Sequence, residues 1–231
     1  MGNGTMMVID GDQCRARGWL WNGADTMSQG VLILAHGAGA PMDSPFMQRM
    51  AELLAERGVG VLRFEFPYMA ERRRSGGKRP PNPQAQLLEC WREVYRLVRE
   101  QVSGPLAVGG KSMGGRMASV LADELEADAL VCLGYPFHAA GKPEKPRVAH
   151  LAELRTPTLI VQGERDALGG RERVEGYSLS PSIEMLWLEA ADHDLKPLKA
   201  SGFSHEQHLQ RAAQAVADFL LTGTVGGRGS R

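Results

Sequence analysis

The sequence predicts an α/β protein with a mostly parallel, doubly wound sheet and helices on both of its faces. Short apolar runs of strand length recur along the chain, and amphipathic stretches with helical spacing separate them. Strands that alternate with helices form right-handed βαβ units, whose strands are parallel and often buried on both faces. In such sheets ligands bind at the carboxyl ends of the strands, so the loops that follow strands are where a site is expected.

Six apolar runs are predicted as strands, and a seventh stretch is predicted to join them. The stretch GWLWNG, residues 18–23, is predicted to add an antiparallel edge strand. The six runs are residues 31–35, 59–66, 106–109, 129–133, 158–162 and 183–188.

Three amphipathic stretches are predicted as helices because each combines a start signal with an apolar stripe. Residues 44–45, Ser-Pro, open the first helix, and residues 82–83, Asn-Pro, open a longer one. The last helix begins at Ser204, which forms a capping box with Gln207 three residues later.

The composition is that of an ordinary globular protein. Of the 231 residues, 43% are hydrophobic and 23% charged, and 27 basic and 27 acidic side chains give a net charge of zero. We therefore expect no general attraction to nucleic acid or to anionic membranes. We expect one domain over residues 1–221 and an unfolded Gly-rich tail over residues 222–231.

The apolar runs and the cysteines predict a cytoplasmic protein. No run approaches the roughly 20 apolar residues that cross a bilayer, and residues 1–13 lack the basic and apolar regions of a secretory signal. Cys14, Cys90 and Cys132 are odd in number and widely spaced. This pattern argues against a disulfide framework or a zinc site and fits a reducing compartment.

The stretch GGKSMGGR, residues 109–116, allows two incompatible interpretations. As the end of a P-loop it would hold a nucleotide phosphate and a magnesium ion. As an elbow, Gly110-x-Ser112-x-Gly114 would present a serine that attacks a carbonyl carbon. A P-loop needs a glycine five residues before Gly110, where the chain has Pro105, and the residues between them are apolar and strand-like. The nucleotide interpretation therefore fails.

The elbow interpretation requires a strand, a sharp turn and then a helix, and LAVGGKSMGGRMASVLADEL supplies that order. Such a turn holds the serine in strained geometry, while glycines two residues away let neighbouring backbone pass closely. Gly110 and Gly114 meet this need. Ser112 would lie at a helix N-terminus, where free N–H groups favour a developing negative charge. Ser112 is therefore the predicted nucleophile.

A serine nucleophile needs a base, and the base needs an acid that orients it. In this class of sheet the chain order is serine, acid, histidine, with the histidine after the last strand. Asp166 follows a strand and is the predicted acid, while its near competitor Glu164 lies closer to the strand end. His193 follows the last predicted strand and is the predicted base.

Three other histidines are interpreted differently. His138 follows a strand but precedes Asp166, so it is a candidate for substrate contact or for support of the site. His205 and His208 fall in the first turns of the last helix and are predicted to face solvent.

Acyl transfer also requires two N–H donors for the oxyanion. The residue after the nucleophile, Met113, is predicted to supply one, and the loop after an earlier strand the other. The sequence HGAG ends a buried strand with small residues, and Ala38 is chosen as the second donor. Gly37 and Gly39 stay open as alternatives and as candidates for substrate contact. His36 is predicted to anchor this loop.

Together these segments resemble the α/β-hydrolase superfamily over nearly the whole chain. The resemblance rests on HGAGAPMDSPFM, FEFPY, GGKSMGGR, GYPFHAAGKP, VQGERDALG and ADHDLKP. More narrowly, the chain is similar to the small capless branch related to dienelactone hydrolases, which includes subunit 3 of the eukaryotic NSL histone-acetyltransferase complex. The resemblance implies that Ser112, Asp166 and His193 match the nucleophile, acid and base. Dienelactone hydrolases proper use a cysteine nucleophile, so the serine departs from their pattern.

The segments around the predicted site bear on access and substrate. The segment between Tyr135 and Thr158 is too short for a helical cap, so an open site is expected. Lys111 either faces the cleft or pairs with a carboxylate at the sheet edge. Residues 71–83 are predicted as a basic loop, which is either a solvated surface or an overhang that attracts an anionic group.

Two classes of function follow from these predictions. The leading hypothesis is a serine hydrolase that cleaves a small carboxylic ester or thioester through an acyl-enzyme, a mechanism that needs no metal or organic cofactor. The alternative is a non-catalytic binding or assembly protein, because fold alone does not determine function. The presence of every triad residue type in the expected order favours the enzyme.

Overall fold

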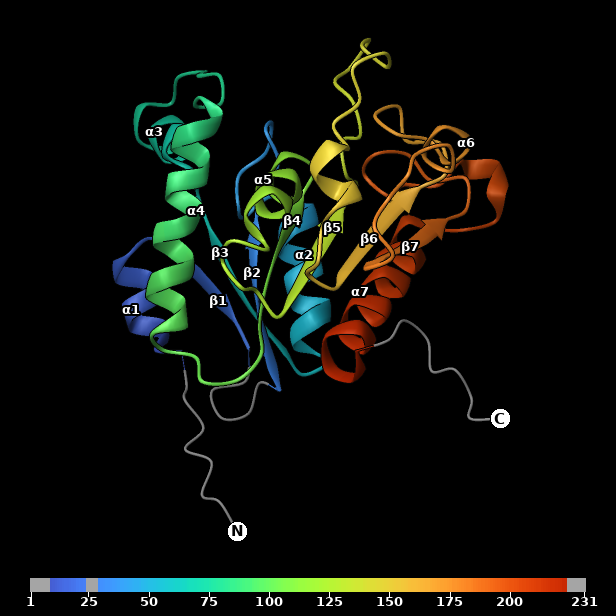
Figure 1. Ribbon diagram of the computed structural model, residues 1–231. Coiled ribbons are helices and arrows are strands. Elements are labelled where there is room, and N and C mark those ends of the chain that lie inside the picture. Colours follow the sequence, from blue (N-terminus) through green and yellow to red (C-terminus); the bar gives the residue numbers. More distant parts are fainter. Residues whose placement is uncertain (1–8, 24–28, 224–231) are drawn as a thin grey trace.

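A computed structural model describes residues 9–23 and 29–223, in which one seven-stranded sheet lies between two layers of helices (Figure 1). The strand order is β1-β3-β2-β4-β5-β6-β7. β1 is antiparallel to β3, and the other neighbouring pairs are parallel. The strands are β1 (Leu20–Asn22), β2 (Gly30–Ala35), β3 (Val59–Phe64), β4 (Leu106–Lys111), β5 (Ala129–Leu133), β6 (Thr158–Gly163) and β7 (Ile183–Leu188).

The predicted strands are all present, with ends that shift by at most two residues. The stretch GWLWNG forms the predicted antiparallel edge strand, with Leu20 opposite Arg63. β2 to β6 are buried along their whole length, which explains why their sequences read as unbroken apolar runs. Most of the predicted unfolded tail, residues 224–231, lies outside the described residues.

The helices cover both faces of the sheet. α1, α4 and α5 contribute to the apolar cluster on one face, and α2 and α7 to the cluster on the other. The predicted capping box at the start of α7 is present, with both Ser204 and Gln207 bonded as expected. The helices are α1 (Gly11–Ala16), α2 (Pro45–Ala55), α3 (Pro67–Ser75), α4 (Gln84–Arg99), α5 (Met113–Leu121), α6 (Arg171–Val174) and α7 (His205–Thr222).

The prediction of a loop over residues 71–83 is wrong in its first part. Residues 71–75 belong to α3, which begins with Pro67 in its first turn and ends at Gly76. Gly76 has φ 69°, the left-handed conformation that commonly terminates a helix. The run of charged residues concealed the helix because α3 has a short apolar face, with Tyr68 and Met69 as its buried side chains.

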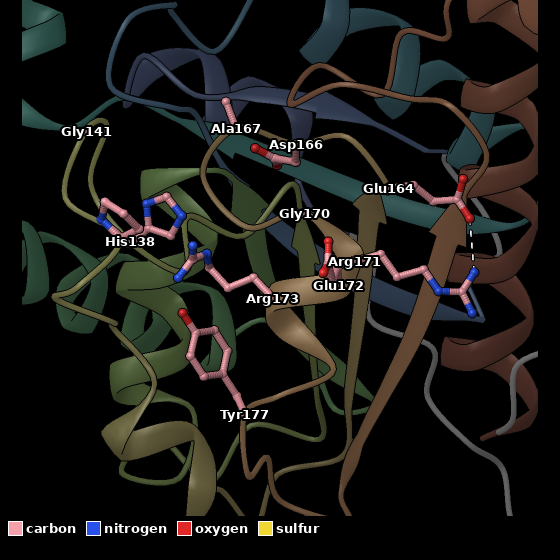
Figure 2. A pocket seen from close by; sticks show the side chains of 11 residues that line it. His138, Gly141, Glu164, Asp166, Ala167, Gly170, Arg171, Glu172, Arg173 and Tyr177 are labelled. Carbon is pink, nitrogen blue, oxygen red and sulfur yellow. Dashed lines mark hydrogen bonds and ion pairs between the residues drawn. The ribbon is translucent and has the colours of Figure 1, made fainter.

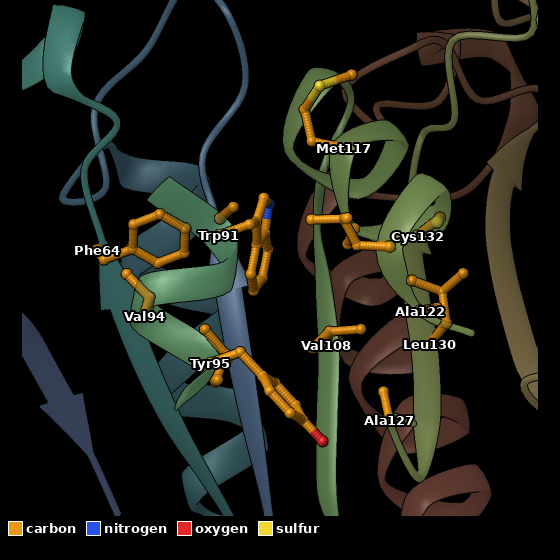
Figure 3. Packing of buried hydrophobic residues seen from close by; sticks show 14 of the residues in the cluster. Phe64, Trp91, Val94, Tyr95, Val108, Met117, Ala122, Ala127, Leu130 and Cys132 are labelled. Atoms are coloured by element: carbon orange, nitrogen blue, oxygen red, sulfur yellow. The ribbon is translucent and has the colours of Figure 1, made fainter. Parts of the chain in front are cut away.

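The core beneath α4 and α5 supports the site from one face of the sheet. Trp91 of α4 is fully buried, and its ring meets that of Phe64 edge-on at 4.9 Å between centroids. Figure 3 shows this pair beside Val94 and Tyr95, with Val108 of β4 and Met117 of α5 on the other side of the cluster. Truncation of a buried tryptophan typically costs about 3–5 kcal/mol, so this packing fixes α4 and α5 firmly.

The loops that follow β4, β6 and β7 meet at the carboxyl edge of the sheet, as parallel pairing requires. Between β5 and β6, residues 134–157 contain only the 3₁₀ helix η1 (Ala149–Ala152), so no cap domain covers this edge. Within the described part of the chain, none of the helices has the length and apolar character needed to cross a membrane.

Candidate active site

Ser112 lies in the sharp turn between β4 and α5, with φ 50° and ψ −115°. A positive φ is strained for a residue with a side chain. The Ser112 N–H donates to the Leu133 carbonyl oxygen at 3.0 Å, which ties the turn to β5. A Cβ added at Gly110 would lie 2.6 Å from the Ala35 oxygen, and one at Gly114 2.5 Å from it. The turn therefore depends on glycine at both positions.

Ser112, His193 and Asp166 form a continuous chain of hydrogen bonds. The distance from Ser112 Oγ to His193 Nε2 is 2.9 Å, and that from His193 Nδ1 to Asp166 Oδ2 is 2.7 Å. A carboxylate only accepts, so Nδ1 carries the proton and Nε2 accepts from the serine hydroxyl. The Asp166 side chain is fully buried, whereas 26% of the His193 side chain is exposed. The structure thus brings the three predicted residues together in a triad-like arrangement.

Gln162, at the end of β6, holds the carboxylate of Asp166, a role not among the predictions from the sequence. Its amide Nε2 donates to Asp166 Oδ2 at 2.8 Å, and its Oε1 accepts the Tyr135 N–H at 2.7 Å. The Leu168 N–H donates to the other carboxylate oxygen at 2.8 Å. Gln162 is fully buried. A polar residue inside an apolar strand was the available signal, because such a residue must find partners within the fold.

Glu164, the competitor for the role of acid, is engaged elsewhere. One of its oxygens pairs with Arg171 at 3.0 Å, and the other accepts the Ala190 N–H at 3.1 Å. Both carboxylate oxygens of Glu164 are thus engaged, and His193 Nδ1 bonds to Asp166 instead.

The predicted oxyanion donors lie beside the nucleophile. Ala38, Met113 and Ser112 line one cavity. Neither the Ala38 nor the Met113 N–H has a hydrogen-bond partner among residues 9–23 and 29–223. The hydroxyl of Tyr68 donates to the Ala38 carbonyl oxygen at 2.9 Å and so fixes that peptide. Burial raises the pKa of Tyr68 to about 12, which keeps this donor protonated.

His36 anchors the same loop, as predicted. Its Nε2 accepts the Phe66 N–H at 3.1 Å, and its Nδ1 lies 2.7 Å from the Gly37 carbonyl oxygen, to which it donates. Burial lowers the pKa of His36, which favours the neutral ring that both contacts require. Gly37 is buried against Lys111 and Ser112, while Gly39 is exposed with open space around it.

The comparison with known families identifies the fold. The α/β-hydrolase domain family matches residues 28–221. The chain belongs to this family.

Solved structures of low sequence identity share the α/β-hydrolase fold. A serine hydrolase without a lid from Xanthomonas campestris has a TM-score of 0.62 at 21% identity and covers 84% of this chain and 86% of its own. An esterase domain from Rhodothermus marinus has a TM-score of 0.63 at 18% identity, and the match covers 89% of this chain and 92% of that domain. A dienelactone hydrolase from Anabaena variabilis has a TM-score of 0.64 at 20% identity, and the match covers 90% of this chain and 92% of that protein. The chain thus shares its fold with these three structures, of which the protein from Xanthomonas campestris has no lid.

The cavity at Ser112, about 400 Å³ in volume, is named here the serine cavity. Its apolar lining includes Leu87, Met117 and Leu168, and its charged lining consists of Arg116 and Arg147.

His138 lines both the serine cavity and a wider neighbouring one of about 800 Å³. Figure 2 shows the wider cavity, with Asp166, Arg173 and Tyr177 around it and the Arg171–Glu164 ion pair at one side. The structure therefore places His138 where a bound molecule could contact it.

Lys111 pairs with a carboxylate, which is the second of the two alternatives. Its Nζ donates to the His193 carbonyl oxygen at 2.8 Å and lies 3.2 Å from Asp194 Oδ1. Burial lowers the pKa of Lys111, and the charge of Asp194 opposes that shift. Lys111 thus supports the loop that carries the base and is absent from the described lining of the serine cavity.

The prediction that His208 faces solvent is wrong. His208 is buried, and its Nδ1 lies 3.2 Å from the Leu195 carbonyl oxygen. Positions 208, 212, 215 and 219 of α7 recur at helical spacing and are all buried, so His208 belongs to the apolar face. His205 is partly exposed.

The described residues include no group of three or more His, Cys, Asp or Glu side chains that could hold a metal ion.

Proposed function

We propose that this α/β-hydrolase is a serine hydrolase that cleaves a carboxylic ester or thioester through an acyl-enzyme. The observation that carries the proposal is the hydrogen-bonded chain from Ser112 through His193 to Asp166. An isolated serine hydroxyl is a weak nucleophile, and a base within hydrogen-bond distance activates it.

In the proposed reaction, Ser112 Oγ attacks the carbonyl carbon while His193 Nε2 takes its proton. Asp166 holds the ring in the required tautomer and stabilises the imidazolium ion. The Met113 and Ala38 N–H groups stabilise the oxyanion, and loss of one such donor costs about 10²–10³ in kcat. His193 then protonates the leaving alcohol or thiol, and water releases the acyl group by the same route in reverse.

Fluorophosphonate labelling with peptide mapping tests this proposal. We expect a rapid adduct on Ser112 that is lost in Ser112→Ala and strongly slowed in His193→Ala, with both variants folded by circular dichroism. Wild-type protein that is folded yet unlabelled would overturn the proposal and favour the binding or assembly role. The finer likeness to subunit 3 of the NSL complex stays a prediction, and such a result would direct a search for protein partners.

The protein would then be assayed with p-nitrophenyl butyrate and butyryl thioesters, to distinguish ester from thioester cleavage. The proposed substrate is a small molecule.

We also propose that the protein is cytoplasmic. The location is supported by Cys14, Cys90 and Cys132, which are all free thiols. Fractionation of cells that express the protein checks the location.

A further inference from the structure

The serine cavity contains two arginines, Arg116 and Arg147, named here the arginine pair. Arg116 lies four residues after Ser112 on α5, so about one helical turn separates them. Arg147 belongs to the segment between β5 and β6. No Asp or Glu is among the described residues that line this cavity. The cavity is therefore cationic in a chain whose net charge is zero.

The guanidinium group of Arg116 is only partly engaged. Its Nη2 donates to Gln84 Oε1 at 3.2 Å, while its Nε is buried without a hydrogen-bond partner in the described part of the chain. Burial lowers the pKa of Arg116, and the nearby charge of Arg147 lowers it further. Arginine normally titrates above about pH 12, so the group stays charged. An unpaired buried donor costs free energy that a bound anion would offset.

Arg147 is fixed through its backbone and is free at its side chain. Its N–H donates to the Phe137 carbonyl oxygen at 2.6 Å, and its own carbonyl oxygen accepts the Tyr135 hydroxyl at 2.9 Å. Across residues 9–23 and 29–223, its guanidinium makes no hydrogen bond and no ion pair. Two like charges at one cavity repel each other, and an anion between them would relieve that repulsion.

Several arginines outside the serine cavity have acidic partners. Arg73 pairs with Glu65 at 2.7 Å, and Arg171 pairs with Glu164 at 3.0 Å. Within residues 71–83, three arginines thus have acidic partners, with the further pairs Arg73–Asp43, Arg74–Glu71 and Arg79–Glu71. Arg72 and Lys78 form no ion pair in the described part of the chain, and Arg72 lies over the ring of Tyr68. The arginine pair lines the same cavity as Ser112 and has no acidic partner among the described residues.

We propose that the arginine pair binds a carboxylate of the substrate, so that the enzyme acts on esters or thioesters that carry a free carboxylate. This inference rests on the proposed function, because it names the substrate class of the same site. Planar guanidinium groups match the geometry of a carboxylate. The apolar side chains of Leu87, Met117 and Leu168 would contact the carbon chain that links the carboxylate to the scissile bond.

Matched substrates test the proposal. The carboxylate belongs either to the acyl part, as in p-nitrophenyl hydrogen glutarate, or to the alcohol part, as in 3-carboxyphenyl butyrate. The neutral counterparts are p-nitrophenyl methyl glutarate and phenyl butyrate. We expect the wild type to prefer the acidic member of one pair by kcat/KM, with the responsive pair showing which part of the substrate carries the anion.

Arg147→Gln is the decisive variant, because the Arg147 side chain has no partner to lose among the residues that the structure describes. We expect kcat/KM for the preferred acidic ester to fall about 10- to 100-fold, while turnover of its neutral counterpart changes less than about twofold. Arg116→Gln should reduce the same preference. Arg173→Gln is the matched control, because Arg173 is exposed and lines the wider cavity instead.

Three results would overturn the proposal. They are equal turnover of acidic and neutral esters by the wild type, an unchanged preference in Arg147→Gln, and an equal loss of preference in Arg173→Gln. If no ester is cleaved at all, the proposed function fails separately. Calorimetric titration with glutarate then decides the inference: binding that Arg147→Gln weakens at least tenfold supports an anion site, and absence of binding refutes it.

Discussion

The amide of Gln162 donates to the same oxygen of Asp166 that accepts the proton-bearing Nδ1 of His193, at distances of 2.8 and 2.7 Å. The acid that orients the base is thus itself oriented by a buried strand residue. Gln162 also donates to the carbonyl oxygens of Tyr135 and Gly169, both at 3.1 Å. A single side chain therefore links β6 to Tyr135, which follows β5, and to the loop that carries Asp166. Its loss should lower both the stability of the fold and the rate of Ser112 labelling.

Gln162→Met keeps most of the side-chain volume and removes these bonds. We expect about 1–3 kcal/mol of destabilisation, because the Tyr135 N–H is left buried without its acceptor. We also expect Ser112 labelling to slow by about tenfold or more, yet less than the roughly 10⁴-fold loss typical of replacing the acid by its amide. Urea unfolding and labelling rates measure the two effects. An unchanged labelling rate would mean that Gln162 serves packing alone.

Ser112→Gly should be more stable than Ser112→Ala. A side chain at φ 50° costs of order 1–3 kcal/mol in strain, whereas glycine adds only about 0.5–1 kcal/mol of chain entropy relative to alanine. We expect a difference of about 1 kcal/mol between the two variants in urea unfolding. Equal stability would show that the elbow stores no strain at this position.

Gly114→Ala should disrupt the elbow, with Gly39→Ala as its matched control. The new methyl group at position 114 would lie 2.5 Å from the Ala35 oxygen and 2.6 Å from the His36 oxygen. We expect about 2–4 kcal/mol of destabilisation and loss of labelling. At Gly39, apart from the adjacent residues in the chain, no atom of the described residues lies within 4 Å of the added methyl, so stability should stay within about 0.5 kcal/mol. A similar loss in both variants would contradict this reasoning.

Stability should fall as pH drops below about 6.5, the ordinary pKa of histidine. Burial lowers the pKa of His36 in the fold, so between that lowered pKa and 6.5 the unfolded chain binds a proton that the folded one does not. The contribution of neutral His36 is thus complete above pH 6.5 and is lost as pH falls through its folded pKa. His150 and His208, whose pKa burial also lowers, act in the same direction.

Urea unfolding of the wild type and of His36→Gln from pH 8 to pH 5 isolates the contribution of His36 to the pH dependence of stability. The pH dependence should be shallower in the variant. The same slope in both proteins would assign the effect to the other histidines.

The strands and the elbow could be predicted because their signals are local. Apolar runs of strand length, glycines around Ser112 and the order serine, acid, histidine can all be read directly from the sequence. Two features could not be predicted: the contact of Gln162 with Tyr135, and the lack of a side-chain partner for Arg147 among the described residues. Strand pairing and loop packing decide which residues that are distant in the chain come into contact. Charge counting over residues 71–83 could not show that Glu65, which lies outside the segment, pairs with Arg73.

The three residues of the triad follow β4, β6 and β7, so Ser112 and its base lie 81 positions apart in the chain. Pairing between distant segments is slow to form, because the loop entropy is lost before the contacts are gained. The hydrogen-bonded triad can therefore form only after β7 has joined the sheet. If a fluorophosphonate is added during refolding, the rate at which Ser112 becomes reactive would therefore measure how fast β7 joins the sheet.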